Sequence, residues 1–282
     1  MKRLVSAIAA VVLLSGAAAS VEVRAQIHER VYPAPKAPLD LAGLPPAATL
    51  ITVATADGLT LRGVEVPPRD GKPTFLIFHG NGSSATNSVL WLGPLVAEGY
   101  GVVAAEYREY SGNPGRASEK GLAADADAFF DRAKAVAGSG QLIVVGHSLG
   151  GGVAFGLASR RKLDGLVTIG TFTRLSAMAP AIARPLLTDR YDNKGAIASL
   201  DEPLFLIHGD ADPVIPYAHG EALKAEAVAA HRQGAMFTVL GAGHGPNAAT
   251  LAMVLKAIAI KVEGGEATAR VTLPANVRLV PF

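Results

Sequence analysis

The chain of 282 residues contains no cysteine. This absence excludes disulfide bonds, lipid attachment to an N-terminal cysteine, and thiolate ligands for zinc. The seven histidines show neither an H-x-x-x-H nor an H-E-x-x-H spacing, so the sequence also lacks a histidine metal motif. We therefore expect a protein that works without a metal and without an organic cofactor.

Charged residues are also scarce, at 18% of the chain, and the formal net charge is only +2. No basic stripe with interleaved aromatic residues is present, so the sequence gives no reason to expect a nucleic-acid partner. Removal of residues 1–25 would take away three of the 26 basic residues and one of the 24 acidic residues, leaving 23 of each. The slight basic excess therefore comes from the N-terminal segment.

That N-terminal segment has the pattern of an export signal. Lys2 and Arg3 precede an uninterrupted uncharged stretch over residues 4–21, and small residues suited to cleavage stand at 17–19 and at Ala25. We expect residues 1–25 to be a signal peptide, cleaved after Ala25 or after Ala19, and the protein to be periplasmic or secreted. The alternative is an uncleaved membrane anchor formed by residues 4–21, through which the protein would associate with a membrane.

The rest of the chain is interpreted as one α/β domain over residues 47–264, preceded by a Pro-rich extended spacer at 26–46. Residues 49–66 alternate around Asp57-Gly58, which predicts a β-hairpin. Beyond the hairpin, short apolar runs that end near 80, 107, 147, 172, 209 and 240 alternate with helical segments near 88–98, 118–136, 149–160, 217–230 and 247–262. This alternation predicts a mostly parallel sheet with helices on both faces. The tail at 265–282 is expected either to add an edge strand or to be disordered.

A candidate nucleophile lies at Ser148. Residues 146–151 read Gly-His-Ser-Leu-Gly-Gly, with an apolar run at 141–145 before them and an Ala-rich helical segment after them. This order of strand, sharp turn and helix is the signature of a nucleophile elbow, in which glycines flank the serine because larger side chains would collide.

A serine hydroxyl needs a base and an orienting carboxylate, and in this arrangement they follow in the order Ser, Asp or Glu, His. Asp212 follows the apolar run at 203–207 and is our candidate for the acid. Asp210 lies closer to the strand and is expected to bond nearby backbone amides instead. His244, in a glycine-rich loop after the strand at 236–240, is the candidate for the general base.

Two backbone amides should bind the oxyanion of a tetrahedral intermediate. One is expected from Leu149, the residue after the nucleophile. The other is expected from Asn81, with Gly82 as the fallback, in the loop that follows the apolar run at 75–78. We expect the side chain of His79, in the same loop, to be structural, and His208 to brace the loop at its strand end.

On these motifs the chain over residues 47–264 resembles α/β-hydrolase-fold serine hydrolases. Within that superfamily it is most similar to a small-lid group of membrane-associated depalmitoylase-like and lysophospholipase-like hydrolases. The segments that carry this finer resemblance are His-Gly-Asn-Gly at 79–82, Glu-Tyr-Arg-Glu-Tyr-Ser-Gly at 106–112, Ser-Glu-Lys-Gly-Leu at 118–122 with Asp125, and Asp-Arg-Tyr-Asp at 189–192. Glu106 and Glu109 depart from the usual Asp and Gly, and we expect them to affect substrate preference more than catalysis.

The resemblance implies hydrolysis of an ester, thioester or amide through an acyl-enzyme, with a small acyl ester or thioester as the partner and a short lid at about 173–202. The lid residues Leu175, Met178, Ile182, Leu186 and Leu187 would either offer an apolar wall to an acyl chain or simply pack the lid onto the domain. Acyl transfer and small-peptide cleavage would use the same triad. A non-catalytic binding module on this fold is a further alternative.

Overall fold

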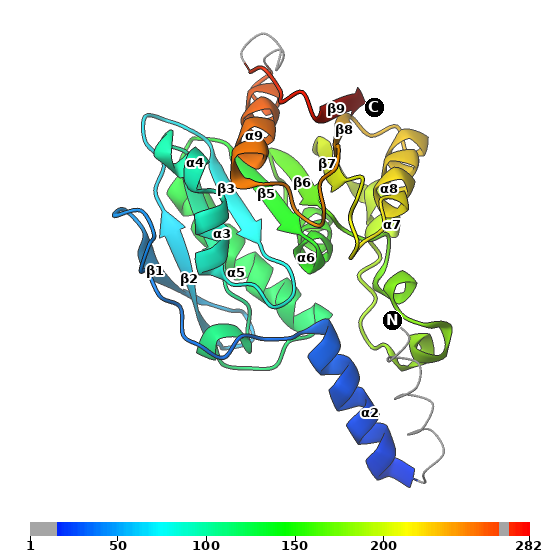
Figure 1. Cartoon of the computed structure of the whole chain (residues 1–282). Coiled ribbons are helices and arrows are strands. Elements are labelled where there is room, and N and C mark those ends of the chain that lie inside the picture. Colours follow the sequence, from blue (N-terminus) through cyan, green and yellow to red (C-terminus); the bar gives the residue numbers. More distant parts are fainter. Residues whose placement is uncertain (1–15, 265–270) are drawn as a thin grey trace.

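A computed structural model describes residues 16–264 and 271–282 (Figure 1). Its centre is a sheet of nine strands in the order β1-β2-β4-β3-β5-β6-β7-β8-β9. The strands from β4 to β8 in this order run parallel, whereas β1, β2 and β9 are antiparallel to their neighbours. The strand bounds are β1 Thr49–Ala54, β2 Thr60–Val66, β3 Thr74–Phe78, β4 Gly101–Ala105, β5 Leu142–His147, β6 Gly165–Ile169, β7 Leu204–Gly209, β8 Gly234–Val239 and β9 Val277–Pro281.

Helices cover both faces of the sheet, as predicted (Figure 1). On one face α3 (Ala85–Trp91), α4 (Gly93–Ala97) and α9 (Ala248–Val262) pack on strand residues such as Phe75 and Ile77. On the other face α5 (Glu119–Ala137), α6 (Leu149–Ala158) and α8 (Ala218–Ala229) pack on alternate residues such as Leu76 and Phe78. Because successive side chains of a strand point to opposite faces, the central strands are apolar throughout and supply both cores.

Helix boundaries follow local chemistry closely. Asn247 caps α9 by accepting a hydrogen bond from the Thr250 amide, and Ser118 caps α5 in the same way. The helix expected over 88–98 is instead two short helices. The break lies at Leu92, and Pro94 follows in the first turn of α4, where its missing amide does not interrupt a helical hydrogen bond.

The expected spacer at 26–46 was wrong in its first part. Helix α2 (Gly16–Val31) continues through these residues to Val31, and the chain after it lies against the domain. Tyr32 is 3% exposed, and Leu39, Leu41 and Leu44 pack on the core. The proline-rich composition therefore does not indicate a free linker here, because apolar side chains between the prolines pack the segment against the domain.

The proposed leader falls largely outside the described residues, which begin at 16, so the structure does not test it. Helix α2 contains the last ten residues of that segment. Within 16–264 and 271–282, no helix is both long enough and apolar enough to cross a membrane.

The C-terminal tail adds an edge strand, one of the two outcomes expected for it. Strand β9 pairs antiparallel with β8, and Phe282 and Gly234 exchange two backbone hydrogen bonds. The sheet therefore extends beyond the expected domain limit at residue 264.

The connection between β6 and β7 occupies the position of the expected lid. It consists of three 3₁₀ turns, η2 (Leu175–Met178), η3 (Ala181–Leu186) and η4 (Ile197–Ser199), with the short helix α7 (Asn193–Ala196). A further 3₁₀ turn, η1 (Tyr110–Gly112), follows β4. The segments after β3, β5, β7 and β8 carry His79, Ser148, Asp212 and His244 at one edge of the sheet, where ligands bind in open α/β sheets.

Candidate active site

The turn at Ser148 is strained and tightly fixed. Ser148 has φ 54° and ψ −115°, a conformation that non-glycine residues adopt at a cost of about 1–3 kcal/mol. Its amide donates to the Ile169 carbonyl at 2.9 Å, and the Thr171 hydroxyl donates to the Ser148 carbonyl at 2.8 Å. These two hydrogen bonds fix the backbone of the turn, and they hold Ser148 at the N-terminus of α6.

Glycine is required around this turn by close backbone approach. A Cβ atom on Gly146 would overlap the Gly150 carbonyl, and one on Gly150 would overlap the Phe78 carbonyl. The motif predicted from the sequence therefore reflects steric contact between β5, α6 and the end of β3.

His244 and Asp212 meet at the same edge of the sheet. Nδ1 of His244 lies 2.9 Å from Oδ2 of Asp212, whose carboxylate has no exposed surface. A carboxylate only accepts, so Nδ1 of His244 carries the hydrogen and Nε2 is free to act as a base. Ser148 and His244 both line one cavity, with Asp212 buried behind the imidazole.

Asp212 is held ionised by its partners. Burial opposes its ionisation, but hydrogen bonds from His244 and from the amides of Ile215 and Val214 outweigh burial and lower the pKa of Asp212 below its ordinary value. The two amides donate to Oδ1 at 2.9 and 2.8 Å.

Asp210 and His208 have supporting positions in the same loop. Asp210 accepts from the Gly241 amide at 2.7 Å, which links the acid loop to the loop of His244. His208 lies 2.9 Å from the Ile215 carbonyl and is 2% exposed, and burial lowers its pKa. His208 thus braces its loop as expected, whereas Asp210 binds an amide of the neighbouring loop and not one of its own turn.

The two expected oxyanion donors also lie on the cavity. Asn81 and Leu149 are both lining residues, and Leu149 is the first residue of α6, where helix amides have no partner within the helix. Gly80 brings their two segments together, because a Cβ on Gly80 would lie 3.1 Å from the Ser148 Cβ.

His79 has the contacts of a structural residue. It is 2% exposed, its Nδ1 lies 2.9 Å from the Gly80 carbonyl, and its ring packs 4.3 Å from that of Tyr107. The Tyr107 hydroxyl in turn donates to the His79 carbonyl at 2.8 Å.

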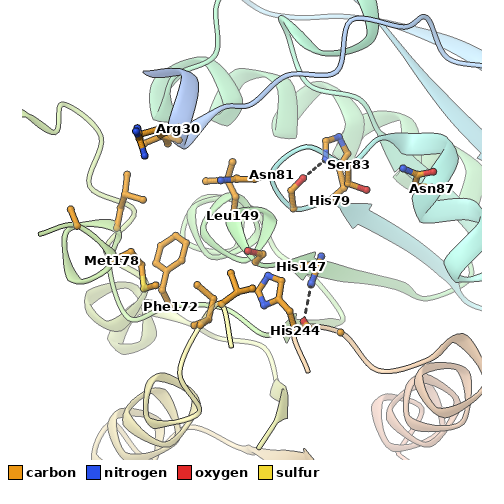
Figure 2. A pocket seen from close by; sticks show the side chains of 18 of the residues that line it. Arg30, His79, Asn81, Ser83, Asn87, His147, Leu149, Phe172, Met178 and His244 are labelled. Carbon is orange, nitrogen blue, oxygen red and sulfur yellow. Dashed lines mark hydrogen bonds between the residues drawn. The ribbon is translucent and has the colours of Figure 1, made fainter. Parts of the chain in front are cut away.

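No role was expected for His147 from the sequence, yet its side chain contacts the expected base (Figure 2). Its Nε2 lies 3.1 Å from the His244 carbonyl, and the two rings are 4.8 Å apart. Burial lowers the pKa of His147 to about 4, and the neighbouring His244 contributes in the same direction. His147 is therefore neutral at neutral pH and donates from Nε2 to the loop of His244. This contact joins residues 97 apart, so local sequence carried no signal for it.

The cavity has a volume of about 760 Å³ and is mostly apolar. Its walls come from the loop after β3, the turn at Ser148, the lid and the loops of Ile215 and His244. Of the lid residues that were weighed, Leu175, Met178 and Leu187 line it, whereas Ile182 and Leu186 do not. Unexpectedly, α2 contributes Ile27, Arg30 and Val31, so the N-terminal helix is part of the wall.

The two departures from the family pattern lie outside the lining residues. Glu106 is fully buried and accepts hydrogen bonds from the Ala85 amide and the Ser111 hydroxyl. Glu109 keeps a positive φ of 73°, where glycine is usual, and its Oε2 lies 2.8 Å from both Nε2 of His28 and the Ala117 amide. Glu106 therefore stabilises the start of α3. We expect Glu109 to affect the cavity through its contact with His28 on α2.

Over the described ranges, no group of three or more acidic or histidine residues has the arrangement of a metal site.

Comparison with known proteins identifies the family to which this fold belongs. The family model described as the alpha/beta hydrolase fold matches residues 73–195. Uncharacterized protein Rv2307c of Mycobacterium tuberculosis is 34% identical over 208 residues, which are 71% of this chain and 73% of that protein. The chain belongs to the α/β-hydrolase family. The expected fold is thereby confirmed, and the coarse assignment as a hydrolase stands with it.

Other similar proteins include hydrolases of several kinds. The lysophosphatidylserine lipase ABHD12 of Xenopus tropicalis is 28% identical over 193 residues, covering 60% of this chain and 50% of that protein. The structure of the Pyrococcus furiosus esterase Pf2001 matches 85% of this chain and 99% of its own, with a TM-score of 0.57 and 19% identity. A puromycin-hydrolyzing peptidase of M. tuberculosis matches 82% of this chain and 41% of its own, with a TM-score of 0.64 and 17% identity. At these identities the structural likenesses show the fold.

The contact at Gly150 predicts that alanine substitution of two glycines of α6 will change the stability of the fold in opposite directions. Gly150→Ala places a methyl group on the Phe78 carbonyl, and we expect it to destabilise the fold by about 3 kcal/mol or more. Gly156→Ala is the matched control, because the nearest atom to its new Cβ is the end of Arg160 at 3.6 Å, and it should stabilise the helix by up to about 1 kcal/mol. Urea unfolding of both variants checks this, and equal stability of the two would contradict it.

The neutral state of His147 predicts a pH dependence of stability. The native pKa of about 4 lies below the ordinary value of 6.5, so between these values the unfolded chain binds more protons than the native one. The free energy of unfolding should fall as pH drops from about 6.5 to about 4, with up to about 1.4 kcal/mol per pH unit from this imidazole. We expect His147→Gln to flatten the profile in urea melts.

The control for that profile is His231→Asn, which removes an exposed histidine and suits its left-handed backbone. A profile of His147→Gln as steep as that of the control would show that His147 is not the group responsible.

Proposed function

We propose that the protein is a serine hydrolase that cleaves a carboxylic ester or thioester through an acyl-enzyme. The supporting observation is the convergence on one cavity of Ser148, in its strained turn, and His244, whose Nδ1 is paired with the buried Asp212. This convergence supports the assignment of a hydroxyl, a base and an orienting carboxylate to the roles that acyl transfer needs.

In the proposed first half-reaction, Nε2 of His244 takes the proton of Ser148 as Oγ attacks the acyl carbonyl. Asp212 keeps the imidazole in the required tautomer and stabilises the imidazolium that forms. The imidazolium then gives its proton to the leaving alcohol or thiol, and the carbon–oxygen or carbon–sulfur bond breaks. The acyl group remains on Ser148.

In the second half-reaction, His244 takes a proton from water as the water attacks the acyl carbonyl, and then returns it to Ser148. The carboxylic acid is released and the enzyme regains its starting state. In both halves the backbone amides of Asn81 and Leu149 would receive the oxyanion, where loss of one donor typically costs about 10²–10³ in rate. No step requires a metal or an organic cofactor.

The cavity and the relatives support an acyl substrate. The walls are largely aliphatic and aromatic, which suits a hydrocarbon acyl chain. One relative is named as a lysophosphatidylserine lipase, and one structure of the same fold is an esterase. A similar peptidase structure keeps amide cleavage as the second candidate. Rates on matched p-nitrophenyl esters and p-nitroanilides would separate the two, and added alcohols would reveal acyl transfer.

The proposal predicts a covalent adduct. A fluorophosphonate probe should label the purified protein on Ser148, located by mass spectrometry, and Ser148→Ala should abolish labelling and esterase activity. A folded protein that takes up no label would instead favour a non-catalytic binding module.

The two aspartates of one loop supply a sharper comparison. Asp212→Asn removes the partner of His244 and should lower kcat/KM by about 10²–10⁴. Asp210→Asn removes the charge but keeps an oxygen that can accept from the Gly241 amide, and it should lower kcat/KM less than about tenfold. A larger effect at Asp210 than at Asp212 would refute the assignment of the acid.

We also propose that the protein is exported, on the pattern of residues 1–25. Both expected cleavage positions, after Ala19 and after Ala25, precede Ile27, so processing would keep the residues of α2 that line the cavity. N-terminal sequencing of the protein from periplasmic and secreted fractions tests this. An intact N-terminus in the membrane fraction would support the anchor instead.

A further inference from the structure

The last turn of α2 presents two different faces. Ile27, Arg30 and Val31 line the catalytic cavity. Their spacing of three and four residues places them side by side on one helix surface. In the view of Figure 2, Arg30, Phe172 and Met178 lie to one side of Leu149, and His79 and Asn87 lie to the other.

The neighbouring face holds this turn on the domain. Nε2 of His28 lies 2.8 Å from Oε2 of Glu109, and the Tyr32 hydroxyl donates to Oδ2 of Asp189 at 2.6 Å. The Tyr32 and Tyr191 hydroxyls are 3.0 Å apart, and the side chain of Tyr32 is buried. Contacts at His28 and at Tyr32 therefore fix the chain on either side of Arg30.

Arg30 supplies a charge that the cavity otherwise lacks. Among the described lining residues it is the one with a permanent charge, and no carboxylate is among them. The ion pairs found in the described part of the chain do not include Arg30, which is exposed. A guanidinium beside an apolar wall is suited to a carboxylate or phosphate, because it offers several donors in a fixed plane.

The surroundings of this wall are cationic as well. A second cavity of about 450 Å³ adjoins the first and shares Ile27, Val31, Leu175 and Leu187 with it. Arg24 and Arg116 line this second cavity. Its described lining has one acidic residue, Asp189, which is already bonded to Tyr32.

We propose that the last turn of α2 determines substrate choice, with Ile27 and Val31 contacting the hydrocarbon part and Arg30 binding an anionic group remote from the scissile carbonyl. The substrate class is thus an amphiphilic ester or thioester with a negative charge at a distance from the reacting bond. This inference rests on the proposed function. It goes beyond that function because the catalytic residues alone do not distinguish charged from neutral acyl esters.

Two pairs of substrates test the proposal on the full-length chain. The first pair is 4-nitrophenyl octanoate and the mono-4-nitrophenyl ester of suberic acid, which differ by a carboxylate at the end of the acyl chain. The second pair is 4-methylphenyl octanoate and 4-(carboxymethyl)phenyl octanoate, which carries the carboxylate on the leaving group. The two pairs show on which side of the ester the charge is bound.

The measured quantity is the ratio of kcat/KM for the charged substrate to that for its neutral partner. Arg30→Gln should lower this ratio about tenfold in at least one pair, and Arg30→Glu should lower it further, because a charge-assisted hydrogen bond is lost and then replaced by repulsion. Arg30→Lys should keep part of the preference, since it retains the charge but not the planar donor group. Any change in rate that is common to both members of a pair cancels in this ratio.

Arg116→Gln is the matched control. It removes the same charge, but Arg116 lines the second cavity and not the catalytic one, and it remains in the protein after either expected cleavage. A ratio that is unchanged in Arg30→Gln for both pairs, or that falls equally in Arg116→Gln, would overturn the proposal. Failure of the proposed function would look different, because neither member of either pair would be cleaved above the level of Ser148→Ala.

Discussion

The strained turn at Ser148 is the constraint on which the site depends. A serine with a positive φ can be kept there only because β5, α6 and the end of β3 meet at van der Waals distance around it, with glycines at 146 and 150. Hydrogen bonds to Ile169 and from Thr171 offset the strain. Because the same close packing brings Gly80 against Ser148, the turn also fixes the loop that contains Asn81.

The titratable side chains that hold the loops around this turn differ in their charge. Asp212 is ionised and buried, whereas burial lowers the pKa values of His208 and His147 and keeps both imidazoles neutral at neutral pH. Two neutral donors therefore hold the loops of Ile215 and His244, and Nε2 of His208 lies farther from Oδ2 of Asp212, at 3.5 Å, than Nδ1 of His244 does. The negative charge of Asp212 is left to act mainly on His244.

The sequence predicted those features that depend on local pattern. The hairpin at Asp57-Gly58, the parallel strands and the position of Ser148 at a strand end follow from alternation, turn residues and close backbone contacts, all of which leave a short-range signal. The helical segment expected near 88–98 contains Gly93 and Pro94, and the structure divides it at Leu92. The role of His147 and the docking of α2 could not be predicted in this way, since they join residues 97 and 81 positions apart.

The family match and the site overlap only in part. The match covers residues 73–195, which include Ser148 and most of the lid but not α2, Asp212 or His244. Glu109 lies inside the match and bonds to His28, which lies outside it. A glycine at position 109 would remove the backbone strain but would also lose the bond to His28. The energetic cost of the strained backbone is therefore offset by the contact that holds α2. The catalytic geometry therefore depends on the sheet, whereas one wall of the cavity depends on a helix that is held by a departure from the family pattern at Glu109 together with the contacts of Tyr32.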